Sequence, residues 1–242
     1  MNILLTNDDG YNSEGIHILK ELLNKYGTVV IVAPKGAMSA KSVSITLEKG
    51  IKVEQVDKTT FICEGTPADC VSFGCNALSI KFDLVVSGCN NGFNLSYDTM
   101  YSGTVGAALE ALTYGIPSIA VSREYNVSNE LVKNNFDKVM KFILDRKLLS
   151  NEYLLNINFP IGEEIKEIRL STLYYSHKQY HYYFNKEIDG YHAYRKPLTD
   201  FSDDRNSDCY LVNHGTVSIT PLNKSYFDKN IYDKLNKFID KN

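Results

Sequence analysis

Two adjacent aspartates, Asp8 and Asp9, directly follow the apolar run at the N-terminus and precede Gly10. Neighbouring side chains of a strand point to opposite faces, so the two carboxylates converge only if the strand has ended and Gly10 allows a turn. Paired carboxylates repel unless a proton or a cation lies between them. The pair therefore suggests a site for Mg²⁺ or Mn²⁺. Alternatively, one aspartate caps the next helix and the other is solvated.

Two further polar loops follow apolar runs that we predict to be strands. The first loop contains Ser39 with two more serines, and the second contains Asn90, Asn91 and Asn94 between glycines. Hydroxyl and amide oxygens complete a metal shell without adding charge. Ordinary turns also favour serine, asparagine and glycine. Three such loops at one sheet edge nevertheless favour a shared site.

A third candidate feature is the sequence YSGTVGAALEAL, in which Ser102, Gly103 and Thr104 open a predicted helix. The free amides at a helix N-terminus, together with hydroxyl groups, bind anions such as phosphate. Helix capping explains Ser102 equally well. Next to a metal loop, this helix start suggests a site for a phosphoester.

The elements that position these loops alternate between short apolar runs and longer amphipathic segments. This alternation predicts an α/β fold with a mostly parallel sheet and helices on both faces. Ligands of such sheets bind beyond the carboxyl ends of the strands. The predicted strands are Ile3 to Thr6, Thr28 to Ala33, Asp83 to Ser87, Ile116 to Ser122 and Tyr153 to Asn158, and the predicted helices are Gly15 to Tyr26, Thr66 to Leu78, Ser102 to Tyr114 and Glu130 to Arg146.

The last third of the chain has a different composition. Residues 170–222 are rich in tyrosine, histidine and asparagine, which we interpret as an extended hairpin that ends in a strand from Thr216 to Thr220. We interpret the many tyrosines as part of exposed strands that pack on another subunit rather than as an aromatic binding surface. We therefore expect a dimer or tetramer. Residues 228–242 are predicted to form a helix with Ile231, Leu235, Phe238 and Ile239 on one side. We expect one domain over residues 1–242, with a core at 1–160.

Composition limits the function classes. The chain has 242 residues, 43% of them hydrophobic, and a formal charge of −3, so no general attraction to nucleic acid or to an anionic membrane is expected. The five cysteines contain no CxxC pair, which favours free thiols in a reducing compartment. No export signal and no apolar run of about 18 residues is present, so we expect a cytoplasmic protein without a membrane span.

Several motifs, in order, resemble the survival protein E (SurE) family. They are TNDDGYNSEGI, APKGAMSAKSVSIT, EGTPADCVSFG, VVSGCNNGFNLSYDTMYSGTVGAALEA, NINFP and VSITPL. The resemblance implies metal-dependent phosphatases of nucleoside 5'- or 3'-monophosphates, one Mg²⁺ or Mn²⁺ per subunit, a Rossmann-like core, a protruding hairpin used in dimerisation and an exchanged C-terminal segment. It places metal ligands at Asp8, Asp9, Ser39 and Asn90, and phosphate contacts at Asn94, Ser102, Gly103 and Thr104. The predicted catalytic residues are Asp8 and Asp9, one of which accepts the proton of the attacking water.

One departure from the family bears on proton transfer. After VSITPL many members carry an aspartate and, four residues later, a histidine, whereas this chain has Ser225 and Lys229. Asp228 and His214 lie nearby in sequence, but we interpret them as a helix N-terminal charge and a turn residue. A nucleotide-binding protein without turnover therefore remains an alternative. A phosphatase that forms an aspartyl phosphate is disfavoured, because it needs aspartates separated by one residue and Gly10 occupies the second position.

Overall fold

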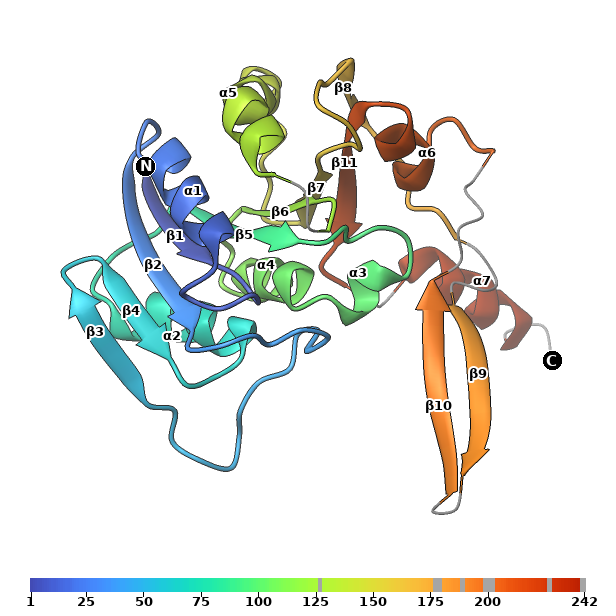
Figure 1. Ribbon diagram of the computed structural model, residues 1–242, viewed down its shortest axis with the longest axis horizontal. Helices are drawn as coiled ribbons and strands as arrows, with labels where there is room; N and C mark the ends of the chain where they lie inside the picture. The colour runs from blue at the N-terminus through green and yellow to red at the C-terminus, as the bar shows by residue number, and fades with distance from the viewer. Residues whose placement is uncertain (126–127, 176–179, 188–189, 198–202, 226–227, 240–242) are drawn as a thin grey trace.

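A computed structural model describes residues 1–125, 128–175, 180–187, 190–197, 203–225 and 228–239. Its centre is a nine-stranded sheet in the order β3-β4-β2-β1-β5-β6-β7-β11-β8, with helices packed on both faces (Figure 1). This arrangement confirms the predicted α/β class and the mostly parallel sheet. The division of the chain into a core, a hairpin region and a terminal helix stays a prediction.

Six neighbouring strands of the sheet run parallel. They are β4 (Thr60–Cys63), β2 (Thr28–Pro34), β1 (Asn2–Thr6), β5 (Leu84–Asn91), β6 (Ser118–Arg123) and β7 (Tyr153–Asn158). Five of them are the strands expected from the sequence, and their apolar residues are almost all buried. The chain fills one side of β1 with β2 and β4, then crosses to the other side with β5. The order of the sheet therefore reverses between β1 and β5, which is where ligands bind in open parallel sheets.

The helices form two layers because alternate residues of each strand face opposite sides of the sheet. Helices α1 (Glu14–Leu23) and α5 (Glu130–Asp145) share one hydrophobic core with Ile3 and Leu5 of β1. Helices α2 (Pro67–Ala77) and α4 (Gly103–Thr113) pack with Leu4 on the other face. All four helices agree with the predicted segments to within a few residues.

Five short elements were not predicted. They are β3 (Val53–Asp57), β4, β8 (Glu167–Leu170), α3 (Asp98–Tyr101) and α6 (Asp208–Asn213). Helices of four and six residues are too short for a helical period to be read from the sequence. Strand β3 is an edge strand with mostly exposed residues, so it lacks the apolar run by which buried strands are found.

The prediction of one extended hairpin over residues 170–222 was wrong for much of that region. Strands β9 (Tyr180–Glu187) and β10 (Gly190–Pro197) do pair antiparallel as a separate two-stranded sheet that extends away from the main sheet in Figure 1. The region also contains α6, and β11 (Thr216–Asn223) joins the main sheet between β7 and β8. Whether the tyrosine side chains of β9 and β10 are exposed lies outside the described residues.

The last described helix is α7 (Lys229–Ile239), close to the predicted terminal helix. The side chains of Ile231 and Leu235 are each 58% exposed. The side chains of Phe238 and Ile239, and residues 240–242, lie outside the described residues. None of the described helices combines the length and the apolar character that crossing a membrane requires. All five cysteines are free thiols.

Candidate active site

A pocket of about 270 Å³ opens where the carboxyl ends of β1 and β5 meet. Four connections contribute to it: the turn after β1, the loop after β2, the end of β5, and the segment that leads into α4. The lining residues are Asp8, Asp9, Ser39, Ala40, Asn90, Asn91, Phe93, Asn94, Asp98, Tyr101 and Ser102. Three loops predicted separately from the sequence therefore do converge on one edge of the sheet.

The side chain of Asn7 shapes the turn that carries the two aspartates. Its Nδ2 donates to the carbonyl oxygen of Gly10 at 3.0 Å and to Oγ of Ser13 at 2.7 Å, while its Oδ1 accepts from the backbone N–H of Gly10 at 3.2 Å. Gly10 has φ +95°, a backbone conformation that favours glycine. This closed turn places Asp8 and Asp9 together at the mouth of the pocket.

Asp8 is a buried carboxylate, with 5% of its surface exposed. Burial raises its pKa to about 6, and the charge of Asp9 adds to the rise, whereas a hydrogen bond from Thr104 opposes it. In that bond Oγ1 of Thr104 donates to Oδ1 of Asp8 at 2.5 Å. Thr104 lies in the first turn of α4 and is fully buried. The first turn of this helix therefore holds the orientation of Asp8.

We expect the variant Thr104→Val to raise the pKa of Asp8 further, because it removes the side-chain hydrogen bond from Thr104 that lowers this pKa. The measurement is a carboxyl titration by NMR of the metal-free protein. Thr104→Ser is the matched control, since it keeps the hydroxyl group and should leave the pKa of Asp8 near that of the unmodified protein. An equal pKa in the valine and serine variants would show that the hydroxyl does not act on Asp8.

Asp9 and the end of β5 are joined directly. The backbone N–H of Asn91 donates to Oδ2 of Asp9 at 2.9 Å. Nδ2 of Asn90 donates to the carbonyl oxygen of Gly92 at 2.8 Å. This bond fixes the side chain of Asn90 at the pocket wall, and its amide oxygen is an acceptor of the type that a metal ion binds.

The loop after β2 carries Ser39 and is held from two sides. The backbone N–H of Met38 donates to the carbonyl oxygen of Asp8 at 2.7 Å, which sets Ser39 beside the aspartate turn. Further along, the buried carboxylate of Asp69 in α2 accepts from the N–H and the hydroxyl of Thr46, at 3.0 and 2.7 Å. Asp69 also completes a capping box with Thr66. The motif EGTPADC thus anchors the serine loop to a helix start.

The phosphate-side loop, which we define as residues 94–102, is anchored to β6 and β7 at its first residue, Asn94. The backbone N–H of Asn94 donates to Oδ1 of Asn158 at 2.9 Å, and Nδ2 of Asn156 donates to the carbonyl oxygen of Asn94 at 2.8 Å. Nδ2 of Asn94 donates to Oγ of Ser122 at 2.8 Å. At the other end of the loop, Oγ of Ser102 accepts from the N–H of Val105, so Ser102 is the predicted N-cap of α4.

Six of the eight site residues expected from the sequence line the pocket: Asp8, Asp9, Ser39, Asn90, Asn94 and Ser102. Gly103 and Thr104 do not line the pocket. They lie next to Asp8 in the first turn of α4. Four residues that position the site were not predicted from the sequence: Asn7, Asp69, Asn156 and Asn158. The motifs NDDG and TPAD were available signals for Asn7 and Asp69, which bind near neighbours. In the motif NIN, Asn156 and Asn158 bind Asn94, which lies 62 and 64 residues away in sequence.

The donor set of this pocket fits a hard divalent cation. Two carboxylates, a hydroxyl and an amide oxygen are the ligand types that Mg²⁺ and Mn²⁺ accept. Among the residues that the structure describes, no basic side chain lines the pocket and no group of three His, Cys, Asp or Glu could hold a metal. A cation bound by Asp8 and Asp9 would therefore need neutral ligands such as Ser39 and Asn90 to complete its coordination shell.

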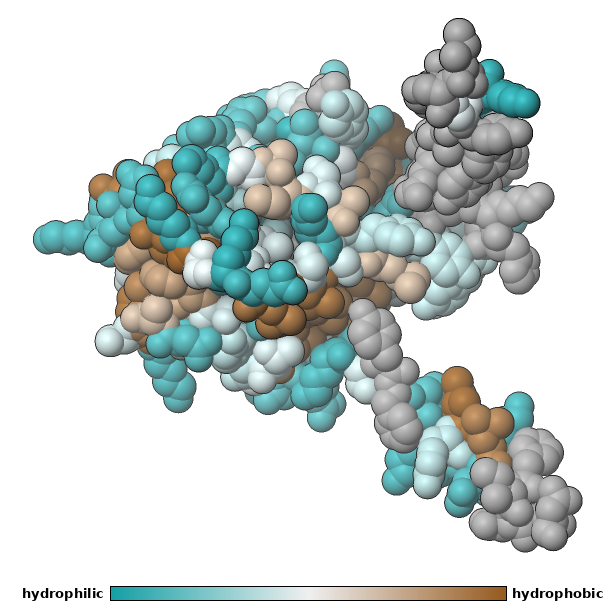
Figure 2. Space-filling view, turned by 90° about the horizontal axis from the view of Figure 1, so that it is seen from below, coloured by the Kyte–Doolittle hydropathy of each residue, from teal (hydrophilic) through white to brown (hydrophobic). Residues whose placement is uncertain are grey.

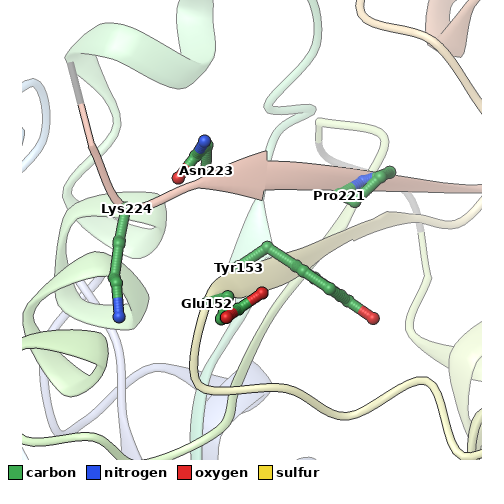
Figure 3. Close-up of a pocket in the computed structure, with 5 residues that line it drawn as sticks. All are labelled: Glu152, Tyr153, Pro221, Asn223 and Lys224. Atoms are coloured by element: carbon green, nitrogen blue, oxygen red, sulfur yellow. The ribbon is translucent and has the colours of Figure 1, made fainter. Parts of the chain in front are cut away.

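A second pocket of about 450 Å³ lies at the opposite edge of the sheet. It is lined by Glu152 and Tyr153 at the start of β7 and by Pro221, Asn223 and Lys224 at the end of β11 (Figure 3). β7 and β11 are antiparallel, so this pocket lies at the amino ends of the parallel strands, away from Asp8. It has one carboxylate and one amine but no loop cluster of the kind that binds ligands in such sheets.

Comparison with known proteins identifies the family. The family model "Survival protein SurE" matches residues 3–180. Curated relatives are 5'-nucleotidase SurE of Clostridium botulinum (strain 657 / Type Ba4), 39% identical over 97% of both chains, and 5'-nucleotidase SurE of Mannheimia succiniciproducens, 40% identical over 92% of both. The crystal structure of the SurE protein from Aquifex aeolicus superposes with a TM-score of 0.86 at 32% identity, covering 98% of this chain and 99% of that one. This chain belongs to the SurE family.

Proposed function

We propose that this protein is a metal-dependent phosphatase that hydrolyses nucleoside 5'-monophosphates, and also 3'-monophosphates, to nucleoside and phosphate. The observation that carries the proposal is the pair of carboxylates, Asp8 and Asp9, in a pocket beside the N-terminus of α4 that no basic side chain of the described residues lines. The curated relatives at 37 to 40% identity are named 5'-nucleotidases, which supports this substrate class.

Asp8, Asp9, Ser39 and Asn90 are the residues that would hold one Mg²⁺ or Mn²⁺. When bound there, the cation would supply Lewis-acid chemistry for phosphoryl transfer to water. Burial of Asp8 and its bond to Thr104 fix one carboxylate, and the N–H of Asn91 fixes the other. Because each carboxylate is oriented by a neighbouring donor before any ligand arrives, little reorganisation accompanies metal binding.

The chain's own groups also act on the phosphate. Asn94 and Ser102 lie on the pocket wall, and Ser102 is the N-cap of α4, so the pocket lies beside a helix N-terminus, which favours an anion. These donors stabilise the charge that develops on the phosphoryl oxygens. Asp8 or Asp9 accepts the proton of the attacking water. Thr104 acts through Asp8, since its hydroxyl donates to that carboxylate.

The direct test is phosphate release from AMP, GMP, 3'-AMP and p-nitrophenyl phosphate by the full chain. The protein is treated with EDTA and then assayed with Mn²⁺, with Mg²⁺ and with neither. We expect release from the nucleotides only when a divalent cation is present. Equal release in EDTA would refute metal dependence, and release from 5'- but not 3'-monophosphates would limit the activity to the 5' position.

The alternative is a metal-dependent nucleotide-binding protein with little turnover. Ser225 and Lys229 favour it, because they replace the acid and base of many family members. The N–H of Ser225 donates to Oδ1 of Asn223, and neither Ser225 nor Lys229 lines the pocket around Asp8. Calorimetry that detects AMP binding in Mn²⁺, together with no phosphate release, would establish the alternative.

We also propose that the protein is a homodimer or homotetramer and works in the cytoplasm. The five free cysteines are compatible with a reducing compartment. Several large apolar side chains are more than half exposed, and Figure 2 shows apolar patches on a face that is otherwise largely hydrophilic. They include Leu47 at 82%, Met100 at 56% and the α7 residues Ile231 and Leu235 at 58% each. Exposed apolar side chains of this size favour contact with a second subunit.

Light scattering at micromolar concentration tests the assembly. We expect a mass of twice or four times the 27.4 kDa of one chain. The double variant Ile231→Glu with Leu235→Glu should lower this mass if α7 lies in the interface, because it places two charges in an apolar contact. Lys234→Glu on the same helix is the control. A mass of one chain for the unmodified protein would contradict the proposal.

A further inference from the structure

The carboxylate of Asp208 is fully buried in α6 and does not line the pocket around Asp8. Asp208 is the first residue of a six-residue helix whose N-cap is Ser207. Burying a carboxylate is costly unless hydrogen bonds replace its water. The partners of Asp208 therefore show what this residue holds in place.

Three backbone N–H groups donate to Asp208. The N–H of Ser96 donates to Oδ2 at 2.8 Å, and the N–H groups of Tyr174 and Cys209 donate to Oδ1 at 3.0 and 2.8 Å. Burial raises the pKa of Asp208, and these three bonds oppose the rise. Only Cys209 belongs to the same helix, whereas Ser96 and Tyr174 lie 112 and 34 residues away in sequence. The carboxylate is thus a junction between distant segments rather than only a helix cap.

The first of these segments is the phosphate-side loop. Ser96 is two residues beyond Asn94, is 4% exposed and has φ +51°, a left-handed conformation that is unfavourable for a serine. The hydroxyl of Thr99 donates to the carbonyl oxygen of Ser96 at 2.7 Å, and the N–H of Ser102 donates to that of Asp98 at 3.0 Å. The position of Ser96 therefore affects the position of Ser102, the N-cap of α4, because one compact hydrogen-bonded turn connects the two residues.

The second segment is residues 171–175, which follow β8 and lead toward β9; we call it the hairpin base. Besides the shared carboxylate, Oγ of Ser96 donates to the carbonyl oxygen of Tyr174 at 2.5 Å. The rings of Tyr97 and Tyr175 meet edge to face, with centroids 5.4 Å apart. The phosphate-side loop and the hairpin base thus contact each other directly and share Asp208 as a common acceptor.

We propose that Asp208 is a positioning residue that sets the phosphate-side loop for substrate and joins it to the hairpin base. The proposal rests on the proposed phosphatase function, since it assigns Asn94 and Ser102 to the phosphoryl group. The Asn156 and Asn158 side chains hold the loop at Asn94. Asp208 holds it at Ser96, so that the stretch ahead of the α4 N-cap has two fixed points.

Asp208→Asn tests this assignment with little change in volume. Its amide nitrogen would face a backbone N–H of Ser96 or Tyr174, so at least one bond is replaced by two opposed donors. We expect the KM for AMP to rise and kcat/KM to fall by about tenfold or more, while the affinity for Mn²⁺ stays within about twofold. Hydrogen exchange should become faster in peptides that cover residues 94–99 and 171–175 together.

The matched control is Asp204→Asn. Asp204 is exposed and accepts from the N–H of Asn206 and from the hydroxyl of Thr172 in the hairpin base, and no hydrogen bond described in the structure joins it to Ser96. It should leave kcat, KM and exchange at residues 94–99 unchanged. Ser96→Ala is a milder second variant that removes only the bond to Tyr174, and it should raise KM and quicken exchange in both segments even if Asp208→Asn does not fold.

Unchanged kcat, KM and exchange in folded Asp208→Asn, or in Ser96→Ala where the first variant does not fold, would overturn the proposal. A lower unfolding temperature with unchanged kcat and KM would show a purely structural residue and would overturn it as well. Failure of the proposed function is a separate result, seen in the unmodified protein as AMP binding without phosphate release. In that case the same variants are compared by their AMP affinity, which should fall while Mn²⁺ affinity is retained.

Discussion

Asp8→Asn should lower phosphate release by at least about 100-fold while leaving the fold intact. The variant keeps an oxygen that can accept from Thr104, but it removes one of the two charges that would hold the cation. The remaining carboxylate of Asp9 and the neutral oxygens of Ser39 and Asn90 form a weak site. The measurement is the turnover of AMP at saturating Mn²⁺, with circular dichroism as the check on folding.

The same variant should make the metal-free protein more stable at neutral pH. The pKa of Asp8 is about 6 in the folded protein, above its ordinary value of 3.8, so the folded state favours the protonated form. The charge of Asp8 therefore does not lower the free energy of unfolding below about pH 4. This free energy falls as the pH rises from about 4 through about 6 and then levels off. At pH 8 the cost that asparagine removes is about 3 kcal/mol at most.

Urea unfolding in EDTA at pH 4 and at pH 8 measures this gain, which should appear only at the higher pH. Asp57→Asn is the control, because hydrogen bonds from Thr59 lower the pKa of that exposed carboxyl group and its loss should bring no gain. Near-normal turnover in a folded Asp8→Asn protein would remove the metal hypothesis. A loss of stability at pH 8 would show that Asp8 is not a strained charge in the metal-free state.

Local patterns in the sequence were enough to predict most of the framework. Strand β1 and the turn after it could be found because the apolar run Ile3 to Leu5 is followed, within a few positions, by two aspartates and a glycine. The N-cap at Ser102 could be found for the same reason, since Ser102 and the N–H donor that it caps, Val105, are three residues apart. Such features depend on neighbours along the chain, which a sequence shows directly.

The supporting contacts could not be predicted, because they join segments far apart in sequence. Thr104 looked like a phosphate ligand, yet its hydroxyl donates to Asp8, 96 residues away. Asp208 looked like part of an extended hairpin, yet it begins a short helix and binds Ser96. The local sequence around Thr104 or Asp208 does not indicate the hydrogen-bond partner, because the order of the strands in the sheet determines which distant segments meet.

Gly103→Ala should weaken Mn²⁺ binding by about tenfold or more and lower kcat/KM for AMP by a similar factor. By helix propensity alone, alanine in α4 should be favoured over glycine by roughly 1 kcal/mol. The packing opposes this preference. A Cβ atom at Gly103 would lie 2.8 Å from Cβ of Asp8, 3.0 Å from its Oδ2 and 3.2 Å from the carbonyl oxygen of Met38.

Asp8 has little freedom to avoid this added methyl group. Its Oδ1 is held by Thr104, its carbonyl oxygen accepts from Met38, and its short side chain has few alternative positions. The methyl group must therefore displace either the carboxylate or the start of α4, and both form the pocket. Gly50→Ala is the matched control, since no atom lies within 4 Å of its added Cβ. If Gly103→Ala bound Mn²⁺ as the unmodified protein does, the close contact between α4 and Asp8 would not set the metal site.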